Sequence, residues 1–205
     1  MSGKEHWQAV YTQKTPDKVS WYRPHLDRSL EFIRSCCLKP DSRIVDVGGG
    51  ASTLVDDLLT EGYSNLAVID LADAALVFAR DRLGERAAAV EWVVGDVTTP
   101  LLSDCSVDMW HDRAVFHFLT EEEARVAYLA QVMRCVKPGG HVLVATFGLD
   151  GPELCSGLPV ARYDSKGIHS VFGHAFDKVG EAAEQHETPW GGVQSFVYCF
   201  CRRTD

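Results

Sequence analysis

Long hydrophobic runs are missing from this sequence. No stretch approaches the roughly 20 apolar residues that a membrane-spanning helix needs, so we expect no membrane partner. Residues 1–13 are polar and lack the apolar core of a signal peptide. The seven cysteines are an odd number and several lie in apolar patterns, which is typical of reduced thiols. These features predict a cytoplasmic protein.

Basic residues are also scarce. The chain has 20 Lys and Arg against 29 Asp and Glu, a net charge of −9. Because binding to a phosphate backbone relies on clustered Lys and Arg, we expect no nucleic-acid partner. Internal repeats, low-complexity tracts and a linker between domains are absent from the sequence, and 205 residues suit one domain. We expect a monomer or a weak homodimer.

Apolar runs and helical patterns alternate through the middle of the chain. The expected strands are residues 44–47, 65–70, 90–94, 106–110 and 141–147, and the expected helices between them are 54–60, 73–83 and 121–136. An earlier helical pattern at 26–37 follows breaks at Pro16-Asp17 and Pro24. Such alternation predicts a parallel sheet covered by helices on both faces.

The last part of the chain changes character. After a loop at 148–163 and a short helix at 165–172, two β segments flank the turn 188–192. This ending predicts a hairpin added to the sheet. We expect one domain over residues 1–205, with a helical lid segment (1–40), a cofactor-binding core (41–147), and an acceptor-side loop with a β-hairpin (148–205).

A glycine-rich turn organises the chain. The run 44–47 leads into Gly48, Gly49 and Gly50, and a helical pattern begins at Leu54. This is typical of a buried strand that turns sharply into a helix beside a nucleotide-like ligand, because glycine lets the backbone approach a bound group. The helix start adds unpaired N–H groups and a partial positive charge.

Three acids stand at the carboxyl ends of successive expected strands: Asp46, Asp70 and Asp96. Ligands of open α/β sheets bind at this edge. Asp70 lies 20 residues beyond Gly50, the separation expected for an acid that binds ribose hydroxyls. Asp96, one strand further along, suits the exocyclic amine of an adenine.

A dinucleotide and S-adenosylmethionine compete as the ligand. The dinucleotide fingerprint requires a third small residue, and Thr53 occupies that position. Asp46 adds negative charge where a pyrophosphate would lie, whereas it suits a ligand that carries an ammonium and a sulfonium. The residues therefore favour S-adenosylmethionine, and a nicotinamide oxidoreductase is the less favoured choice.

Four motifs together resemble the class I S-adenosylmethionine-dependent methyltransferases over essentially the full chain: Val45–Gly50, Ile69-Asp70, Gly95–Val97 and Lys137–His141. The resemblance implies a Rossmann-like, doubly wound α/β fold with a seven-stranded sheet. Its strand order is 3-2-1-4-5-7-6, with the seventh strand antiparallel. This agrees with the expected hairpin.

The resemblance also implies roles for individual residues. The residues expected to bind the cofactor are Asp46, Gly48, Gly49 and Gly50 at the methionine moiety, Asp70 at the ribose, and Asp96 and Val97 at the adenine, together with Leu71, His111, Trp21 and Tyr22. His111, Asp112 and Arg113 would lie under the transferable methyl as catalytic residues. As alternatives, His111 is a packed histidine, and Asp112 and Arg113 form a structural ion pair.

Two short segments suggest possible acceptors. Residues 110–114 resemble thiopurine-type methyltransferases and the lysine methyltransferases of elongation factor, and His6-Trp7-x-x-x-Tyr11 resembles the N-terminal lid of the latter. We expect Trp7, Tyr11, Arg162 and Tyr163 to bind the acceptor; the alternative for the aromatic residues is a packed hydrophobic lid. Cys199 and Cys201 share one strand face without a second ligand pair, so we expect no metal.

These observations predict an S-adenosylmethionine-dependent methyltransferase. The chain has almost no inserted substrate domain, which favours a small molecule or an exposed protein side chain over folded nucleic acid as the acceptor, and of these we expect the small molecule. The enzymatic alternative is a protein lysine N-methyltransferase that modifies an exposed side chain. A further alternative is a methyltransferase-like binding protein without turnover.

Overall fold

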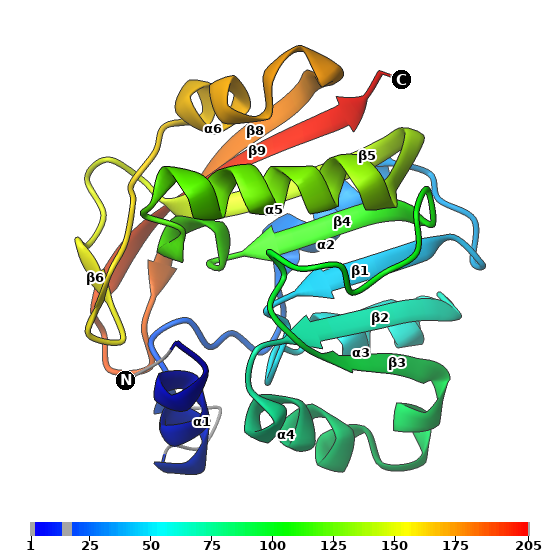
Figure 1. Ribbon diagram of the computed structural model, residues 1–205. Helices are drawn as coiled ribbons and strands as arrows, with labels where there is room; N and C mark the ends of the chain where they lie inside the picture. Colours follow the sequence, from blue (N-terminus) through cyan, green and yellow to red (C-terminus); the bar gives the residue numbers. More distant parts are fainter. Residues whose placement is uncertain (1–2, 14–17, 205) are drawn as a thin grey trace.

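A seven-stranded sheet runs through the molecule, with helices on both faces (Figure 1). The computed structural model describes residues 3–13 and 18–204. The strands of this sheet are β1 (Arg43–Val47), β2 (Asn65–Asp70), β3 (Val90–Val94), β4 (Val107–Arg113), β5 (Val136–Phe147), β8 (Phe176–Glu187) and β9 (Val193–Arg203). The α-helices are α1 (Gly3–Gln13), α2 (Asp27–Ser35), α3 (Leu54–Thr60), α4 (Asp73–Leu83), α5 (Glu122–Cys135) and α6 (Ser165–Phe172). Short elements are η2 (Gly84–Ala89), η3 (Phe116–Phe118), η4 (Gly173–Ala175) and the small hairpin of β6 (Leu154–Cys155) and β7 (Leu158–Pro159).

The strand order is β3-β2-β1-β4-β5-β9-β8. Neighbours from β3 to β5 pair in parallel, and β9 pairs antiparallel with both β5 and β8. Since β8 and β9 are the sixth and seventh strands of this sheet along the chain, the predicted order 3-2-1-4-5-7-6 and the antiparallel seventh strand are confirmed.

Both faces of the central strands are buried. On one face Ile44 packs with residues of α2 and α3, such as Ile33 and Leu58. On the other face Val45 packs with residues of α5 and α6, such as Tyr128 and Ile168. Successive side chains of a strand point to opposite faces, so a continuous apolar run is what a doubly covered strand requires.

Two strands are longer than the sequence predicts. β4 continues to Arg113, so the predicted catalytic segment lies within the strand rather than after it. β5 begins at Val136, and residues 137–140 bulge from its pairing with β4. Gly139 takes a positive φ of 76° there, and Lys137 forms an ion pair of 2.8 Å with Asp108.

The segment after residue 18 docks on the terminal hairpin. His186 Nε2 donates a hydrogen bond to the Ser20 carbonyl over 2.6 Å, and Arg23 pairs with Glu184. This docking holds the segment over the carboxyl ends of the strands. Pro16 and Asp17, at the predicted break, lie outside the described residues. In residues 3–13 and 18–204, no helix has the length and apolar character needed to cross a membrane.

Candidate active site

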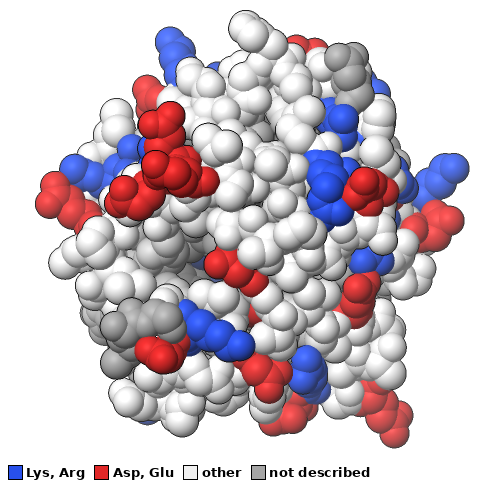
Figure 2. All heavy atoms as spheres, viewed as in Figure 1, with Lys and Arg blue, Asp and Glu red and all other residues white. Residues whose placement is uncertain are grey.

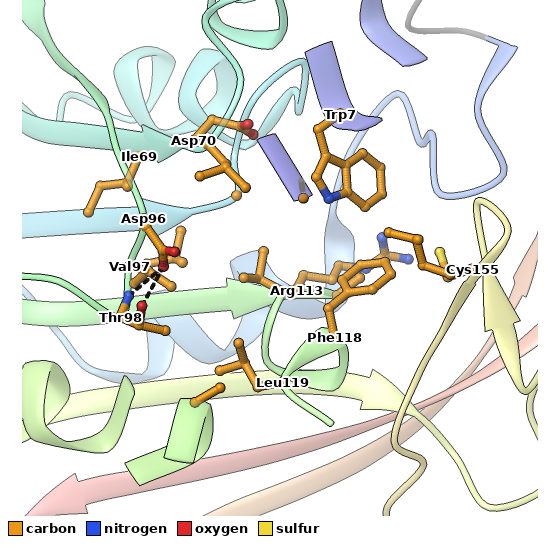
Figure 3. Close-up of a pocket in the computed structure, with 18 of the residues that line it drawn as sticks. Trp7, Ile69, Asp70, Asp96, Val97, Thr98, Arg113, Phe118, Leu119 and Cys155 are labelled. Atoms are coloured by element: carbon orange, nitrogen blue, oxygen red, sulfur yellow. Dashed lines mark hydrogen bonds between the residues drawn. The ribbon is translucent and has the colours of Figure 1, made fainter. Parts of the chain in front are cut away.

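A cavity of about 430 Å³ opens at the carboxyl edge of the sheet (Figure 3). Its walls come from α1, the ends of β1, β2 and β4, the loop after β3, η3 and the β6–β7 hairpin. The predicted site residues that line it are Trp7, Tyr11, Trp21, Gly48, Asp70, Leu71, Asp96, Val97 and Arg113. A smaller pocket of about 40 Å³ shares some of these walls, and it brings in Asp46, Gly49, Tyr22 and His111.

The glycine turn is required by close contacts. Gly48 has a φ of 64°, and a Cβ on it would lie 2.0 Å from a methyl carbon of Val115. A Cβ on Gly49 would lie 2.4 Å from Asp46 Oδ2. Gly50 does not line either pocket; a Cβ there would lie 2.6 Å from Asp70 Oδ2. The glycines therefore keep space around the two acids.

Asp46 is held by a buried chain of hydrogen bonds. It is 4% exposed, and its Oδ1 accepts a hydrogen bond of 2.7 Å from His111 Nδ1, because a carboxylate can only accept. His111 Nε2 lies 2.9 Å from Ser29 Oγ, so both ring nitrogens are engaged. Asp46 Oδ2 is buried without a partner among the described residues. A hydrogen-bond donor from a ligand would satisfy this oxygen.

Asp70 is a second buried acid. Its Oδ1 accepts a hydrogen bond of 2.8 Å from the Ala72 N–H. Burial raises the pKa of this carboxyl to about 7, and the charge of Asp46 raises it further against the effect of the Ala72 N–H. The carboxyl therefore changes charge near neutral pH.

Asp96 lies at the same end of the cavity (Figure 3). Its Oδ1 accepts hydrogen bonds from the Thr98 N–H at 2.9 Å and the Thr98 hydroxyl at 2.7 Å. Ile69 and Val97 supply apolar surface beside it. A polar carboxylate next to apolar walls suits a heteroaromatic ring with an amino group.

The opposite end of the cavity is aromatic. The Trp7 ring meets Phe118 at 5.1 Å and Trp21 at 5.7 Å between ring centroids, both edge to face. Tyr11 packs against Trp7 and Trp21. Cys155 closes this end from the β6–β7 hairpin at 3% exposure, and burial raises the pKa of its thiol to about 12. These walls suit a flat or apolar group.

Arg113 lies between the two pockets and lines both. Its Nε donates to Tyr198 Oη at 3.2 Å, one terminal nitrogen donates to the Trp21 carbonyl at 3.3 Å, and the guanidinium lies 4.2 Å from the centre of the Phe196 ring. The other terminal nitrogen is buried without a partner among the described residues. Tyr198 in turn donates to Glu184.

Several predicted residues are not brought to the large cavity. Asp112 points to the opposite face of β4, where it accepts hydrogen bonds from Tyr128 Oη at 2.7 Å and the Val115 N–H at 3.0 Å. Burial raises the pKa of Asp112 to about 6. The geometry assigns it to holding the η3 turn, since alternate residues of a strand face opposite sides. Asp112 also makes no ion pair with Arg113, so the alternative prediction of a structural ion pair between them is wrong.

The predicted acceptor residues of the loop after β5 also lie elsewhere. Arg162 pairs with Glu153 at 3.0 Å and donates to the Gly151 carbonyl. Tyr163 packs on Phe116, 5.6 Å between ring centroids. The β6–β7 hairpin turns the chain back before these residues, so earlier residues of the loop line the cavity instead.

Part of the aromatic end was predicted from the sequence, since Trp7, Tyr11 and Trp21 line it, whereas Phe118 was not. The cavity residues to which no individual role was assigned are Gly3, Val47, Ile69, Gly95, Thr98, Ala114, Val115, Phe118, Leu119, Thr120, Ala124, Cys155, Leu158 and Pro159. Phe118 and Leu119 follow the predicted segment 110–114 in an apolar run, which was the available signal. Ser29 carried no signal, because a serine in an amphipathic helix is ordinarily exposed.

Comparison with known proteins agrees with this geometry. Residues 44–140 match the family model described as a methyltransferase domain. The eEF1A lysine and N-terminal methyltransferase of Mus musculus is 24% identical over 183 residues, which span 89% of this chain and 24% of that protein. The phosphoethanolamine N-methyltransferase of Triticum aestivum is 28% identical over 152 residues, 71% of this chain and 28% of that protein. The chain thus spans about a quarter of the length of these relatives.

Solved structures share the fold. The N-methyltransferase NodS of Bradyrhizobium japonicum, solved with S-adenosylhomocysteine, has a TM-score of 0.72 at 16% identity and covers 98% of this chain and 100% of that one. A methyltransferase of Anabaena variabilis has a TM-score of 0.75 at 13% identity, with 99% and 96% covered. Residues 44–140 belong to the methyltransferase-domain family, and the whole chain has the fold of the class I S-adenosylmethionine-dependent methyltransferases. The expected cofactor, S-adenosylmethionine, is confirmed with the family.

Proposed function

We propose that the protein transfers the methyl group of S-adenosylmethionine to a small molecule bound at the aromatic end of the cavity. The observation that carries this proposal is the recessed position of that end. Cys155 is buried, and Trp7, Phe118 and Arg113 are half-buried. A small flat acceptor fits between such walls, which exclude water from the reacting atoms.

The residues present fit the cofactor. The unpartnered Asp46 Oδ2 accepts a hydrogen bond from the ammonium of the methionine moiety. The glycine turn beside it leaves space that a Cβ at any of its glycines would occupy. Asp70 accepts hydrogen bonds from the ribose hydroxyls beside Leu71, and Asp96 with Val97 binds the adenine. When bound, the cofactor supplies a methyl group on a positively charged sulfur. In this proposal Trp21 and Tyr22 cover the methionine moiety.

The chain contributes position rather than a strong base. Burial raises the pKa values of Tyr11 and Cys155, so both stay protonated at neutral pH. His111 has both nitrogens engaged and lies in the smaller pocket, where it orients Asp46. We therefore propose an acceptor atom that is nucleophilic without help, such as a thiolate or a heteroaromatic nitrogen. Proximity and alignment then supply most of the acceleration.

Incubation with methyl-labelled cofactor in a cell lysate tests this proposal. The expected result is label in the low-molecular-weight fraction that depends on added enzyme. An Asp70→Ala enzyme provides the background. Label confined to the protein fraction would overturn the small-molecule assignment.

Protein lysine methylation is the second candidate, and a specific feature favours it. Glu121, Glu122 and Glu123 are exposed at the start of α5, next to the cavity residues Thr120 and Ala124. Figure 2 shows acidic side chains gathered over this part of the molecule. Such a group attracts a lysine-rich surface. The lysine methyltransferase relatives, which match 89% of this chain, support this candidate.

A binding protein without turnover is the remaining alternative. It predicts tight binding of S-adenosylmethionine without any label transfer in either fraction. Calorimetry with S-adenosylhomocysteine and the labelling experiment together separate it from both enzymes.

A further inference from the structure

Two residues of opposite charge line the smaller pocket, and each carries a buried polar atom without a partner among the described residues. One is Asp46 Oδ2 and the other is the terminal guanidinium nitrogen Nη2 of Arg113. A buried polar atom without a partner is costly, and a charged one is more so. The two atoms therefore point to a ligand that carries both a positive and a negative group.

The pairing of β1 with β4 brings these residues together. Asp46 is in register with His111, and Arg113 follows two residues later on the same strand. Residues two apart on a strand share a face and lie roughly 7 Å apart. His111 hydrogen-bonds to Asp46 on one face of the sheet, so Arg113, two residues further along β4, lies on the same face near Asp46.

Each group is fixed from behind. His111 and Ser29 hold Asp46 through Oδ1, so Oδ2 is the oxygen left for the pocket. Tyr198, the Trp21 carbonyl and the Phe196 ring hold the guanidinium of Arg113 on its other sides. The described residues contain no carboxylate within 4.0 Å of Arg113 to neutralise it. Glu184 acts on Arg113 only across Tyr198, so the guanidinium has no direct ion pair. A preorganised cation of this kind binds an anion at little entropic cost.

The size of the pocket limits the ligand group to a small one. About 40 Å³ holds a few heavy atoms, because a single water needs roughly 10–15 Å³. An amino acid carries its ammonium and its carboxylate on one carbon, so its two recognition groups must be neighbours. A separate acceptor has more room in the large cavity than here.

We propose that Arg113 binds the α-carboxylate of the amino-acid end of S-adenosylmethionine, opposite the ammonium at Asp46. Arg113 is then a cofactor-binding residue rather than a catalytic one. The proposal rests on the assignment of Asp46 to the methionine moiety. It makes the cofactor site specific for a complete amino-acid end.

The test compares ligands that differ only at this end: S-adenosylhomocysteine, its decarboxylated analogue, and methylthioadenosine, which lacks the amino acid. Calorimetry measures their affinities for the wild type and for Arg113→Met, Arg113→Lys and the surface control Arg28→Met. We expect the wild type to bind S-adenosylhomocysteine about 10- to 100-fold more tightly than the decarboxylated analogue. Arg113→Met should abolish that preference, Arg113→Lys should keep part of it, and Arg28→Met should leave it unchanged.

Equal loss of affinity for all three ligands in Arg113→Met would overturn the proposal, since a merely structural arginine acts on every ligand alike. An unchanged preference for S-adenosylhomocysteine in Arg113→Met would also overturn it. The comparison of ligands on the wild type needs no variant, so equal affinities there overturn the proposal even if Arg113→Met folds poorly. A wild type that binds none of the ligands would instead overturn the proposed methyltransferase function itself.

Discussion

The two ends of the cavity are built in different ways. The polar end, with Asp70 and Asp96, comes from residues at or just beyond the ends of neighbouring parallel strands. The aromatic end gathers Trp7 from α1, Phe118 from η3 and Cys155 from the β6–β7 hairpin, which are far apart in the chain. Local sequence therefore specifies the first end, whereas only long-range packing assembles the second.

The largest expected effect lies at the glycine turn beside the polar end, where space is tightest. In Gly49→Ala the new Cβ meets Asp46 Oδ2 at 2.4 Å and Val68 at 2.8 Å, both in buried surroundings. We expect the affinity for S-adenosylhomocysteine to fall by about 100-fold, about 2.7 kcal/mol by calorimetry. Gly62→Ala is the control, because nothing lies within 4 Å of its Cβ. It should lower the melting temperature through its φ of 90° without changing affinity.

Asp70→Asn tests the same end through its charge. We expect a 10- to 100-fold weaker binding of S-adenosylhomocysteine at pH 8, because the ionised carboxylate is the stronger acceptor for hydroxyl groups. In the wild type, affinity should rise as pH increases through about 7, the raised pKa of Asp70, and this rise should disappear in the variant. A variant that retains the pH dependence would remove Asp70 from the ribose site.

The stability of the cofactor-free protein should fall as pH rises through about 7, whereas cofactor affinity rises. Burial raises the folded-state pKa of Asp70 above its ordinary value near 4. Its contribution to the stability of the cofactor-free protein is therefore fully present below about pH 4 and is lost as pH rises through about 7. At pH 8 the melting temperature of cofactor-free Asp70→Asn should accordingly exceed that of the wild type.

A smaller effect is expected from Trp7→Leu at the aromatic end. Loss of the edge-to-face contacts with Phe118 and Trp21 should reduce turnover about tenfold, measured with the acceptor that the labelling experiment identifies. The affinity for S-adenosylhomocysteine should stay within about threefold of the wild type. Trp190→Leu, the same change at an exposed position, should alter neither quantity. An equal loss of cofactor affinity and turnover in Trp7→Leu would mean that the two ends are not separate.

Arg162→Ala should have the smallest effect. Its side chain pairs with exposed Glu153 outside the cavity, and exposed ion pairs contribute about 0–1 kcal/mol. We expect turnover and KM for the acceptor to change less than about twofold. A large rise in KM would show that the loop at 148–163 folds over the acceptor during turnover.

The position of a predicted site residue followed from the sequence where that residue lies at the end of a strand. Asp46, Gly48, Asp70 and Asp96 are within or next to buried apolar runs, so their place at the sheet edge follows from strand direction alone. The prediction failed at Asp112, because the end of β4, and hence the face on which each residue lies, depended on pairing with β5.

The sequence by itself predicted the alternation of strands and helices and the sheet edge at which Asp46, Asp70 and Asp96 lie, because periodicity and the spacing of glycines and acids are local properties. The strand order and the cofactor family came from the resemblance of its motifs to a known family. Only the tertiary structure decided that His111 orients Asp46 with Ser29, and that Arg113 is anchored by Tyr198 and Phe196. The physical reason is that a side chain acquires its partners, and therefore its charge and its role, from residues brought close by packing.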